Sequence, residues 1–199
     1  MQSTYYDTKE EWEKSRIGKI TGTRLKDIVA RSCEKKIGYY KLIAEKIAIS
    51  PDGENAMERG VRLEPEALIR FEQETGKEVY NDLVIWSRED VSSIAISPDA
   101  YVDEKEAVEV KCLSSERHIE AYLKNNVPAE YRYQTLQYFV VNDDLEKLNV
   151  VFYDPRIPVK DYFVIEIIRS DVADEVQYLL DYQKKVISEV NEIVNDLTF

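Results

Sequence analysis

The sequence predicts a single α/β or α+β domain covering residues 1–199, and three observations support this prediction. The chain has 199 residues, enough for one substantial core but too few for two comfortable ones. Hydrophobic residues make up 44% of the chain and aromatic residues 11%, as in folded globular proteins. The hydrophobic spacing changes from helical before Gly76 to short β-rich runs after it. The sequence shows no internal repeat, low-complexity tract or linker, so one domain is the simplest organisation.

The first part of the chain is predicted to be helical. Its expected helices cover residues 7–17, 38–47 and 54–75, and another begins at Thr21. Pro65 interrupts the third of these ranges, because proline lacks an amide N–H and clashes with the preceding turn. We therefore expect a kink or a new helix start at Pro65.

The second part of the chain is predicted to mix strands and helices. The expected strands cover residues 79–80, 83–86, 93–96, 101–102, 107–112, 148–153 and 162–168. The expected helices cover residues 115–124, 129–141 and 171–197. The last helix carries an apolar stripe, which predicts packing on the chain's own core rather than a coiled-coil partner.

The charge distribution keeps a nucleic-acid partner open. A formal net charge of -12 argues against binding phosphate, which needs local cations. Residues 14–36, however, contain eight Lys and Arg and only two acidic residues. The chain from Ser170 onward contains two Lys and seven acidic residues. The basic segment is either a working face for DNA or ordinary solvated surface.

Cysteine usage and hydropathy indicate the compartment. Cys33 and Cys112 are too few for a disulfide framework or a four-thiolate metal site, and they fit a reducing compartment. No apolar run reaches the roughly 18 residues of a membrane span, and the polar start lacks a signal-peptide pattern. We therefore expect a cytosolic protein without a membrane partner.

The strongest candidate site lies on the expected strand 107–112. Side chains alternate along a strand, so Glu109 and Lys111 share one face. The turn at Pro98 would bring the carboxylate of Asp99 beside Glu109. Two close carboxylates repel each other unless a cation neutralises them, and Mg2+ prefers such oxygen ligands. The alternatives are a same-face ion pair on an exposed strand and a turn-forming aspartate.

Two expected helices supply further candidates. Glu64 lies on the apolar face of its helix, where a lone carboxylate is costly to bury and a metal-bound one is stabilised. The alternative for Glu64 is an edge position with access to water. A later helix carries polar and aromatic residues on one side, namely Tyr131, Gln134 and Tyr138, with Gln137 on its flank. The side-chain amides of the two glutamines are either hydrogen-bonded core groups or contacts for a phosphate and a nucleophilic water, and both alternatives stay open.

Other catalytic classes find little support. His118 is the one histidine, and we expect it on a surface-like polar helix without a catalytic role. The lack of further histidines excludes His-rich zinc hydrolases, and a Ser-His-Asp triad would need His118 itself. A Gly-rich phosphate loop is also missing, because Gly18-x-x-x-Gly22 is too short and lacks the following Lys-Ser/Thr.

Five motifs occur in order along the chain. They are residues 12–23, which fit W-x(3)-R-x-G-x-[IV]-T-[AG]-[ST], then the G-x-x-x-E pair of Gly60 and Glu64, Ser97-Pro98-Asp99, Glu109-Val110-Lys111, and the Y-x-x-Q pair of Tyr131 and Gln134. In this order and spacing the chain resembles the lambda-type alkaline exonucleases, the YqaJ-like viral recombinase family within the PD-(D/E)XK nuclease superfamily. The resemblance implies a restriction-endonuclease-like core, in which helices flank a central mixed β-sheet.

The resemblance also implies a set of metal ligands. Asp99 and Glu109, with the Val110 carbonyl, would hold two Mg2+ ions per active site, for which Mn2+ can substitute. Glu64 would complete the site through a water, and Lys111 would orient or help activate the attacking water. Two metal ions can stabilise the attacking and leaving oxygens of an in-line displacement at phosphorus.

A second set of residues would bind the terminal 5′ phosphate of the digested strand. By resemblance this set is Arg16, Thr23, Ser97 and Gln134, and Gln134 also counts among the catalytic residues. A guanidinium forks onto phosphate, while hydroxyls and an amide complete its shell. The sequence departs from the family pattern at Ala100, where glycine usually follows Ser-Pro-Asp, and at Thr23, where serine is commoner.

The function implied is a Mg2+-dependent 5′-to-3′ exonuclease that digests one strand of linear double-stranded DNA to mononucleotides. The 3′ single-stranded overhangs would serve phage-type recombination through a single-strand annealing protein, in a bacterial cytoplasm. The family includes ring-shaped trimers, so a homotrimer is expected by resemblance.

Two alternatives remain. One is a restriction-like or Cas4-like DNA endonuclease, although Cas4-like enzymes normally carry an iron–sulfur cluster on four cysteines, which two cannot supply. The other is a non-catalytic DNA-binding assembly protein with a decayed site, and the intact Asp99, Glu109 and Lys111 argue against it.

Overall fold

The computed structural model describes residues 8, 10, 11, 14, 37, 40, 44 and 56–197. The helices expected over residues 7–17, from Thr21 onward and over 38–47 fall largely or wholly outside these residues, and they stay predictions. The same holds for Arg16 and Thr23, which lie outside the described residues.

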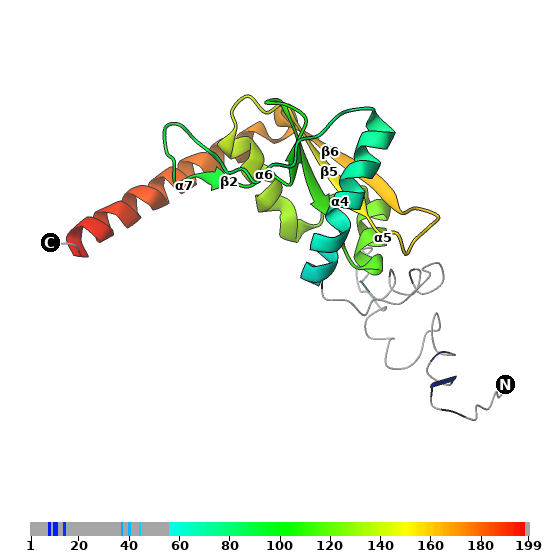
Figure 1. Cartoon of the computed structure of the whole chain (residues 1–199). Helices are drawn as coiled ribbons and strands as arrows, with labels where there is room; N and C mark the ends of the chain where they lie inside the picture. Colours follow the sequence, from blue (N-terminus) through cyan, green and yellow to red (C-terminus); the bar gives the residue numbers. More distant parts are fainter. Residues whose placement is uncertain are drawn as a thin grey trace. The chain divides into compact units, whose positions relative to one another are not determined.

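The described chain mixes helices and strands, as Figure 1 shows. In order, the elements are α4 (Ala56–Thr75), β1 (Trp86–Ser87), β2 (Ala95–Ile96), β3 (Ala100–Tyr101), β4 (Glu106–Lys111), α5 (Ser115–Lys124), the 3-10 helix η1 (Ala129–Tyr131), α6 (Arg132–Val141), β5 (Lys147–Tyr153), β6 (Tyr162–Ile168) and α7 (Arg169–Leu197). The expected helix over 115–124 is confirmed, and the strand over 162–168 is confirmed as well. The helix expected over 129–141 is divided, because its first turn is a 3-10 helix.

Four strands form the main sheet, in the order β3-β4-β5-β6, and β1 pairs with β2 in a separate ribbon. β3 and β4 are antiparallel, with Ala100 opposite Val108 and Tyr101 opposite Ala107. The inner residues of β4 and β5 are buried on both faces of the sheet. The charged Glu109 of β4 is therefore exceptional among these inner residues.

The helix α4 corrects one expectation. We expected Pro65 to kink or restart this helix, but α4 is a single helix from Ala56 to Thr75 that includes Pro65. The side chain of Pro65 is exposed, whereas Ala67, Leu68 and Phe71 are buried. Burial of this apolar face stabilises the helix enough to offset the hydrogen bond that Pro65 cannot donate. The prediction of a new helix start was therefore wrong.

Packing divides the chain into two compact units, which we describe separately. The first contains the chain up to Leu63 together with Cys112–Asn126 and Phe152–Phe163. Its Asp154-Pro155-Arg156 turn is built around Asp154, which is fully buried and accepts hydrogen bonds from Ser115 Oγ at 2.6 Å and Arg156 Nε at 2.7 Å. Burial raises the pKa of Asp154, and the Ser115 and Arg156 hydrogen bonds oppose this.

His118 also belongs to the first unit, and its position corrects a second expectation. The side chain is 1% exposed, so α5 is not surface-like at this point. Nε2 lies 2.9 Å from the Lys160 carbonyl oxygen, which can only accept, so Nε2 carries the proton. The ring packs edge-on against Phe163, with centroids 4.8 Å apart. Burial lowers the pKa of His118 to about 4.

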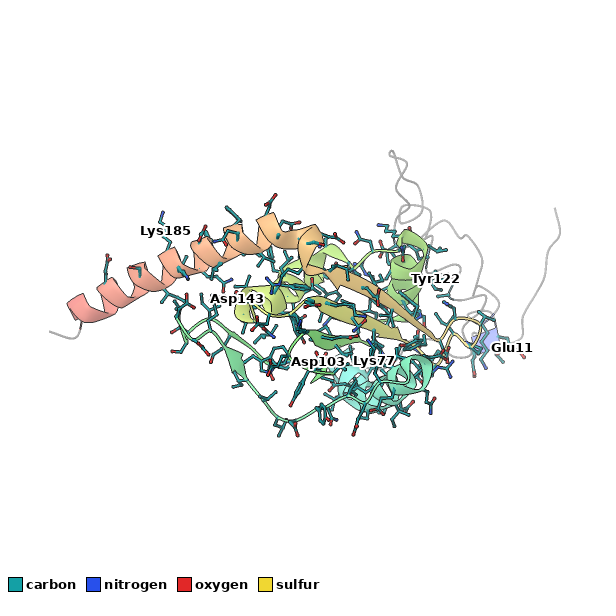
Figure 2. All side chains as sticks on the ribbon, turned by 90° about the horizontal axis from the view of Figure 1, so that it is seen from above. Glu11, Lys77, Asp103, Tyr122, Asp143 and Lys185 are labelled. Atoms are coloured by element: carbon teal, nitrogen blue, oxygen red, sulfur yellow. The ribbon has the colours of Figure 1, made fainter. Side chains whose placement is uncertain are left out.

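The second unit contains Glu64–Lys111, Val127–Val151 and Val164–Phe199. Within it α6 packs against α7 and β2. α7 extends beyond the sheet in Figure 1, and Figure 2 shows Lys185 on this extending part and Asp143 beside the end of α6. None of the described helices is long and apolar enough to cross a membrane.

Candidate active site

Glu109 lies at the centre of the candidate site and is 1% exposed. As predicted, β4 places it on the same side as Lys111, whose ammonium group donates a hydrogen bond to Glu109 Oε1. Gln134 Nε2 donates to the same oxygen at 2.7 Å, and the Tyr138 hydroxyl donates to Oε2 at 2.5 Å. Burial raises the pKa of Glu109 and the charge of Asp99 raises it further, whereas Lys111 and Tyr138 lower it.

Asp99 reaches the same site from the turn between β2 and β3. Because Ala100 pairs with Val108, this turn meets the middle of β4. The Val110 N–H donates to Asp99 Oδ2 at 2.8 Å, and the Asp99 N–H donates to the Tyr138 hydroxyl oxygen at 3.3 Å. Burial raises the pKa of Asp99, and the Val110 hydrogen bond opposes this. The expectation that Asp99 lies beside Glu109 is confirmed.

Glu64 contributes a third carboxylate from α4 and is partly buried. Burial raises the pKa of Glu64 and the charge of Asp99 raises it further, whereas Lys111 lowers it. Glu64 therefore lies within electrostatic reach of both residues. Its partly buried position falls between the two alternatives considered, a buried metal ligand and a water-accessible edge.

Lys111 supplies positive charge to these carboxylates. Its Nζ atom donates to Gln134 Oε1 at 3.1 Å and lies 4.7 Å from the centroid of the Tyr131 ring, a favourable cation–π distance. Gln134 therefore bridges two charged groups, because its amide oxygen accepts from Lys111 while its amide nitrogen donates to Glu109. The Y-x-x-Q pair thus lies at the carboxylate cluster.

Sequence reasoning assigned no role to Tyr138. The available signal was its spacing of four residues from Gln134, but a tyrosine on an apolar helix face is commonly a core residue. The structure shows that its hydroxyl contacts both Glu109 and the Asp99 backbone. Burial and the charges of these two residues raise the pKa of Tyr138, so the hydroxyl keeps its proton.

The expected phosphate-binding residues are brought together only in part. Gln134 lies at the carboxylate cluster, whereas the exposed Ser97 donates from Oγ to the Val84 carbonyl at 2.9 Å. Gln137 points elsewhere and donates to Gln183 Oε1 at 3.1 Å. With Arg16 and Thr23 outside the described residues, this binding set stays a prediction.

The donor set can be compared with the needs of a divalent cation. Within the described part of the chain, no three acidic, His or Cys side chains are arranged to hold a metal ion as they stand. The chemistry nevertheless fits, because Glu64, Asp99 and Glu109 offer hard oxygen ligands. The charge of Asp99 raises the pKa of both glutamates, and a bound cation would relieve that repulsion.

These features define the class of protein. Helices flank a central mixed sheet, and a Glu-x-Lys pair on a sheet strand lies beside an aspartate on a neighbouring turn. This is the α/β fold of the PD-(D/E)XK nucleases. The chain belongs to the family described as the YqaJ-like viral recombinase domain, whose model matches residues 11–144.

Solved structures agree with this assignment. The crystal structure of LHK-Exo, an alkaline exonuclease from Laribacter hongkongensis, matches with 27% identity and a TM-score of 0.57, covering 94% of this chain and 99% of the other. The complex of LHK-Exo with dAMP matches with 26% identity and a TM-score of 0.61, covering 95% and 98%. A comparison with curated proteins gave no significant match. The family and structural matches support a nuclease of the lambda exonuclease type.

Proposed function

We propose that this protein is a Mg2+-dependent 5′-to-3′ exonuclease that digests one strand of linear double-stranded DNA to mononucleotides. The observation that carries the proposal is the cluster of Asp99, Glu109 and Lys111 on β4 and its neighbouring turn. The complex of LHK-Exo with dAMP supports mononucleotide release, since a mononucleotide occupies that related protein.

Asp99, Glu109 and the Val110 carbonyl would hold two Mg2+ ions, with Glu64 completing the site and Mn2+ as a substitute. Bound metal would neutralise charge on the attacking and leaving oxygens at phosphorus. The Lys111 ammonium group would orient the attacking water or help to activate it through its positive charge, and the amide oxygen of Gln134 accepts a hydrogen bond that fixes this ammonium group.

Selection of the strand end would fall to Arg16, Thr23, Ser97 and Gln134. A guanidinium with hydroxyl and amide donors suits a terminal 5′ phosphate. Ser97 lies two residues before Asp99, so a phosphate bound at Ser97 would put the first phosphodiester near the carboxylates.

The proposed assembly is a homotrimer ring around the duplex, acting in the cytoplasm of a bacterial host. Its 3′ overhangs would be passed to a single-strand annealing protein. Family resemblance supports this assembly, and sedimentation equilibrium would test it, with three times the monomer mass as the expected result and a monomer as the contradicting one.

The activity can be tested with Mg2+ and three DNA substrates. These are a linear duplex with 5′ phosphates, the same duplex without them, and a closed circle. The parent protein should digest the phosphorylated duplex fastest and leave the circle intact. Cutting of the circle would favour the restriction-like endonuclease instead, and binding without any digestion would favour a non-catalytic assembly protein.

The same substrates test the phosphate-binding set. Arg16→Ala should mainly erase the preference for phosphorylated ends, because the guanidinium would no longer fork onto phosphate. Equal activity of the parent protein on both linear ends would contradict this part of the proposal.

A further inference from the structure

One buried hydroxyl joins the two elements that carry the central carboxylates. Tyr138 on α6 is fully buried. Its hydroxyl donates to Glu109 Oε2 at 2.5 Å, and its oxygen accepts the Asp99 N–H at 3.3 Å. Glu109 belongs to β4 and Asp99 to the turn between β2 and β3, so this one group fixes both elements.

The ring that carries this hydroxyl is held separately. Trp86 on β1 packs edge-on against the Tyr138 ring, with centroids 6.4 Å apart and an interplanar angle of 84°. Such aromatic contacts stabilise ring packing without the hydroxyl. Removing the hydroxyl alone should therefore leave the ring in place.

The hydrogen bonds of Glu109 use its two oxygens unequally. A carboxylate oxygen has about two acceptor positions. Oε1 already accepts from Lys111 and Gln134, which fill both of its positions. Oε2 accepts from Tyr138 and keeps one position for a further ligand. Because Tyr138 fixes Oε2, it also sets the direction of that remaining position.

We infer that Tyr138 is a positioning residue that aims Glu109 Oε2 at the divalent cation, an inference that rests on the metal-dependent nuclease function proposed above. Tyr138 acts through Glu109 and the Asp99 backbone and does not contact the DNA. A hydroxyl that accepts an N–H bond is polarised and becomes a stronger donor in its own bond. The Asp99 N–H thereby strengthens the hold of Tyr138 on Glu109.

The test compares Tyr138→Phe with Tyr133→Phe, which removes a hydroxyl from an exposed position on the same helix. Mn2+ binding to chelator-treated protein is measured by calorimetry, and the Mg2+ requirement of digestion is measured separately. Partners that orient metal ligands typically change metal affinity or activity by 10- to 100-fold. Tyr138→Phe should weaken Mn2+ binding and raise the Mg2+ requirement by about this factor, with KM for the duplex unchanged, and Tyr133→Phe should match the parent protein.

The outcomes separate this inference from the proposed function. A parent protein that digests DNA, with Tyr138→Phe equal to Tyr133→Phe in metal binding, would overturn the role of Tyr138 alone. A parent protein that binds Mn2+ but digests no DNA would overturn the nuclease function, while the binding comparison still decides the role of Tyr138. A parent protein that binds no Mn2+ would overturn both.

If Tyr138→Phe does not fold, the inference can still be tested on protein that keeps the Tyr138 hydroxyl. Infrared difference spectra on adding Mn2+, with 13C-labelled tyrosine, should show a shift of a phenol C–O band. The Tyr131→Phe protein should still show this band. That result would exclude Tyr131, whose ring lies beside Lys111, as the source of the band. Absence of any tyrosine band would overturn the inference.

Discussion

At the scale of single residues, Asp99 is the most decisive test of the site. Asp99→Asn keeps an oxygen that can accept the Val110 N–H but removes the negative charge. We expect digestion to fall by more than about 100-fold, because changes in residues that only support metal ligands already cost 10- to 100-fold. Asp99→Ala should likewise abolish cleavage, as measured by mononucleotide release.

The control for this prediction is Asp174→Asn, which removes a charge from an exposed position on α7. Its activity should equal that of the parent protein. If Asp99→Asn retained a tenth or more of the parent rate, Asp99 would not be a metal ligand.

His118 gives a prediction for the pH dependence of stability. Its pKa is about 4 in the folded chain, against an ordinary value of 6.5, so the unfolded chain binds the proton first as pH falls. The stabilising contribution is complete above pH 6.5 and is lost as pH falls toward 4, by about 2 to 3 kcal/mol at pH 4.5. Neighbouring charges act in opposite senses, since Asp161 raises this pKa and Lys160 lowers it.

Urea unfolding at pH 7 and 4.5 can measure this effect. His118→Gln keeps a donor for the Lys160 carbonyl but does not titrate. The parent protein should therefore lose about 2 to 3 kcal/mol more than His118→Gln between the two pH values. Equal losses would show that His118 does not become protonated on unfolding in this range.

Residues close in sequence were easier to predict than residues that meet through packing. Glu109 and Lys111 lie two apart on one strand, so strand alternation alone placed them together. Tyr138 meets Glu109 across 29 residues, and His118 meets Phe163 across the unit, so neither contact has a local signal. Such contacts depend on tertiary packing, which the spacing of one element does not contain.

At the scale of elements, α4 contains a proline that should destabilise it. Pro65→Ala would restore an amide donor within the helix and remove the clash with the preceding turn, a gain of up to about 3 kcal/mol. Without the rigid proline the unfolded chain has more conformational entropy, which opposes this gain by about 0.4 to 1 kcal/mol. We expect a net stabilisation of about 1 to 2 kcal/mol in urea unfolding.

Val61→Ala serves as the control, because Val61 is an exposed apolar residue of the same helix. Its unfolding free energy should stay within about 0.5 kcal/mol of the parent. A destabilised Pro65→Ala protein would mean that a proline-induced bend in α4 is needed for packing.

Arg88 connects several elements at the edge of the second unit. Its guanidinium forks onto Asp143 with bonds of 2.7 and 2.8 Å, donates to the Val140 carbonyl of α6 at 2.6 Å, and contacts Asp90 at 2.7 Å. Asp90 in turn pairs with Lys184 of α7 at 2.6 Å. Hydrogen bonds to charged groups contribute about 1.5 to 3 kcal/mol, so Arg88→Lys should destabilise the chain by about that amount.

The comparison for Arg88→Lys is Arg132→Lys, since Arg132 pairs with Glu175 where both side chains are substantially exposed. Exposed ion pairs contribute at most about 1 kcal/mol, so Arg132→Lys should change the unfolding free energy by less than that. Equal effects of the two changes would show that the partly buried position of Arg88 adds nothing to the stability of the chain.

The elements themselves were predictable to different degrees. The bounds of α5 were predicted correctly, because the helix ends where Asn125 adopts the left-handed conformation that asparagine tolerates well. α4 ends similarly before Gly76, at φ 69°. The strands expected over 83–86 and 93–96 are only two residues long each, since their length depends on a partner strand that sequence does not specify.

At the scale of the whole molecule, the net charge and the fold give opposite indications about DNA binding. A formal net charge of -12 opposes DNA binding, while the family and the fold support a nuclease. Cations can reconcile the two, both from the basic segment over 14–36 and from bound metal. The composition showed the charge, but the fold was needed to show where the carboxylates meet.

Metal binding should therefore stabilise the whole molecule. The negative charge of Asp99 raises the pKa of both Glu64 and Glu109 in the folded chain. A cation that binds the folded chain relieves this repulsion and stabilises it by about 2.7 kcal/mol at a free concentration 100 times its Kd. Chelator-treated protein should show a Tm that rises with added Mg2+ and falls again on chelation.

NaCl at equal ionic strength separates specific binding from screening of the acidic surface, because screening acts through ionic strength whichever salt supplies it. Glu109→Gln removes the charge of one proposed metal ligand, so its Tm should lose most of the Mg2+-dependent rise while its response to NaCl matches that of the parent protein. If NaCl reproduced the whole Mg2+ effect in the parent, or if Glu109→Gln kept the full rise, the stabilisation would come from the acidic surface rather than from the site on β4.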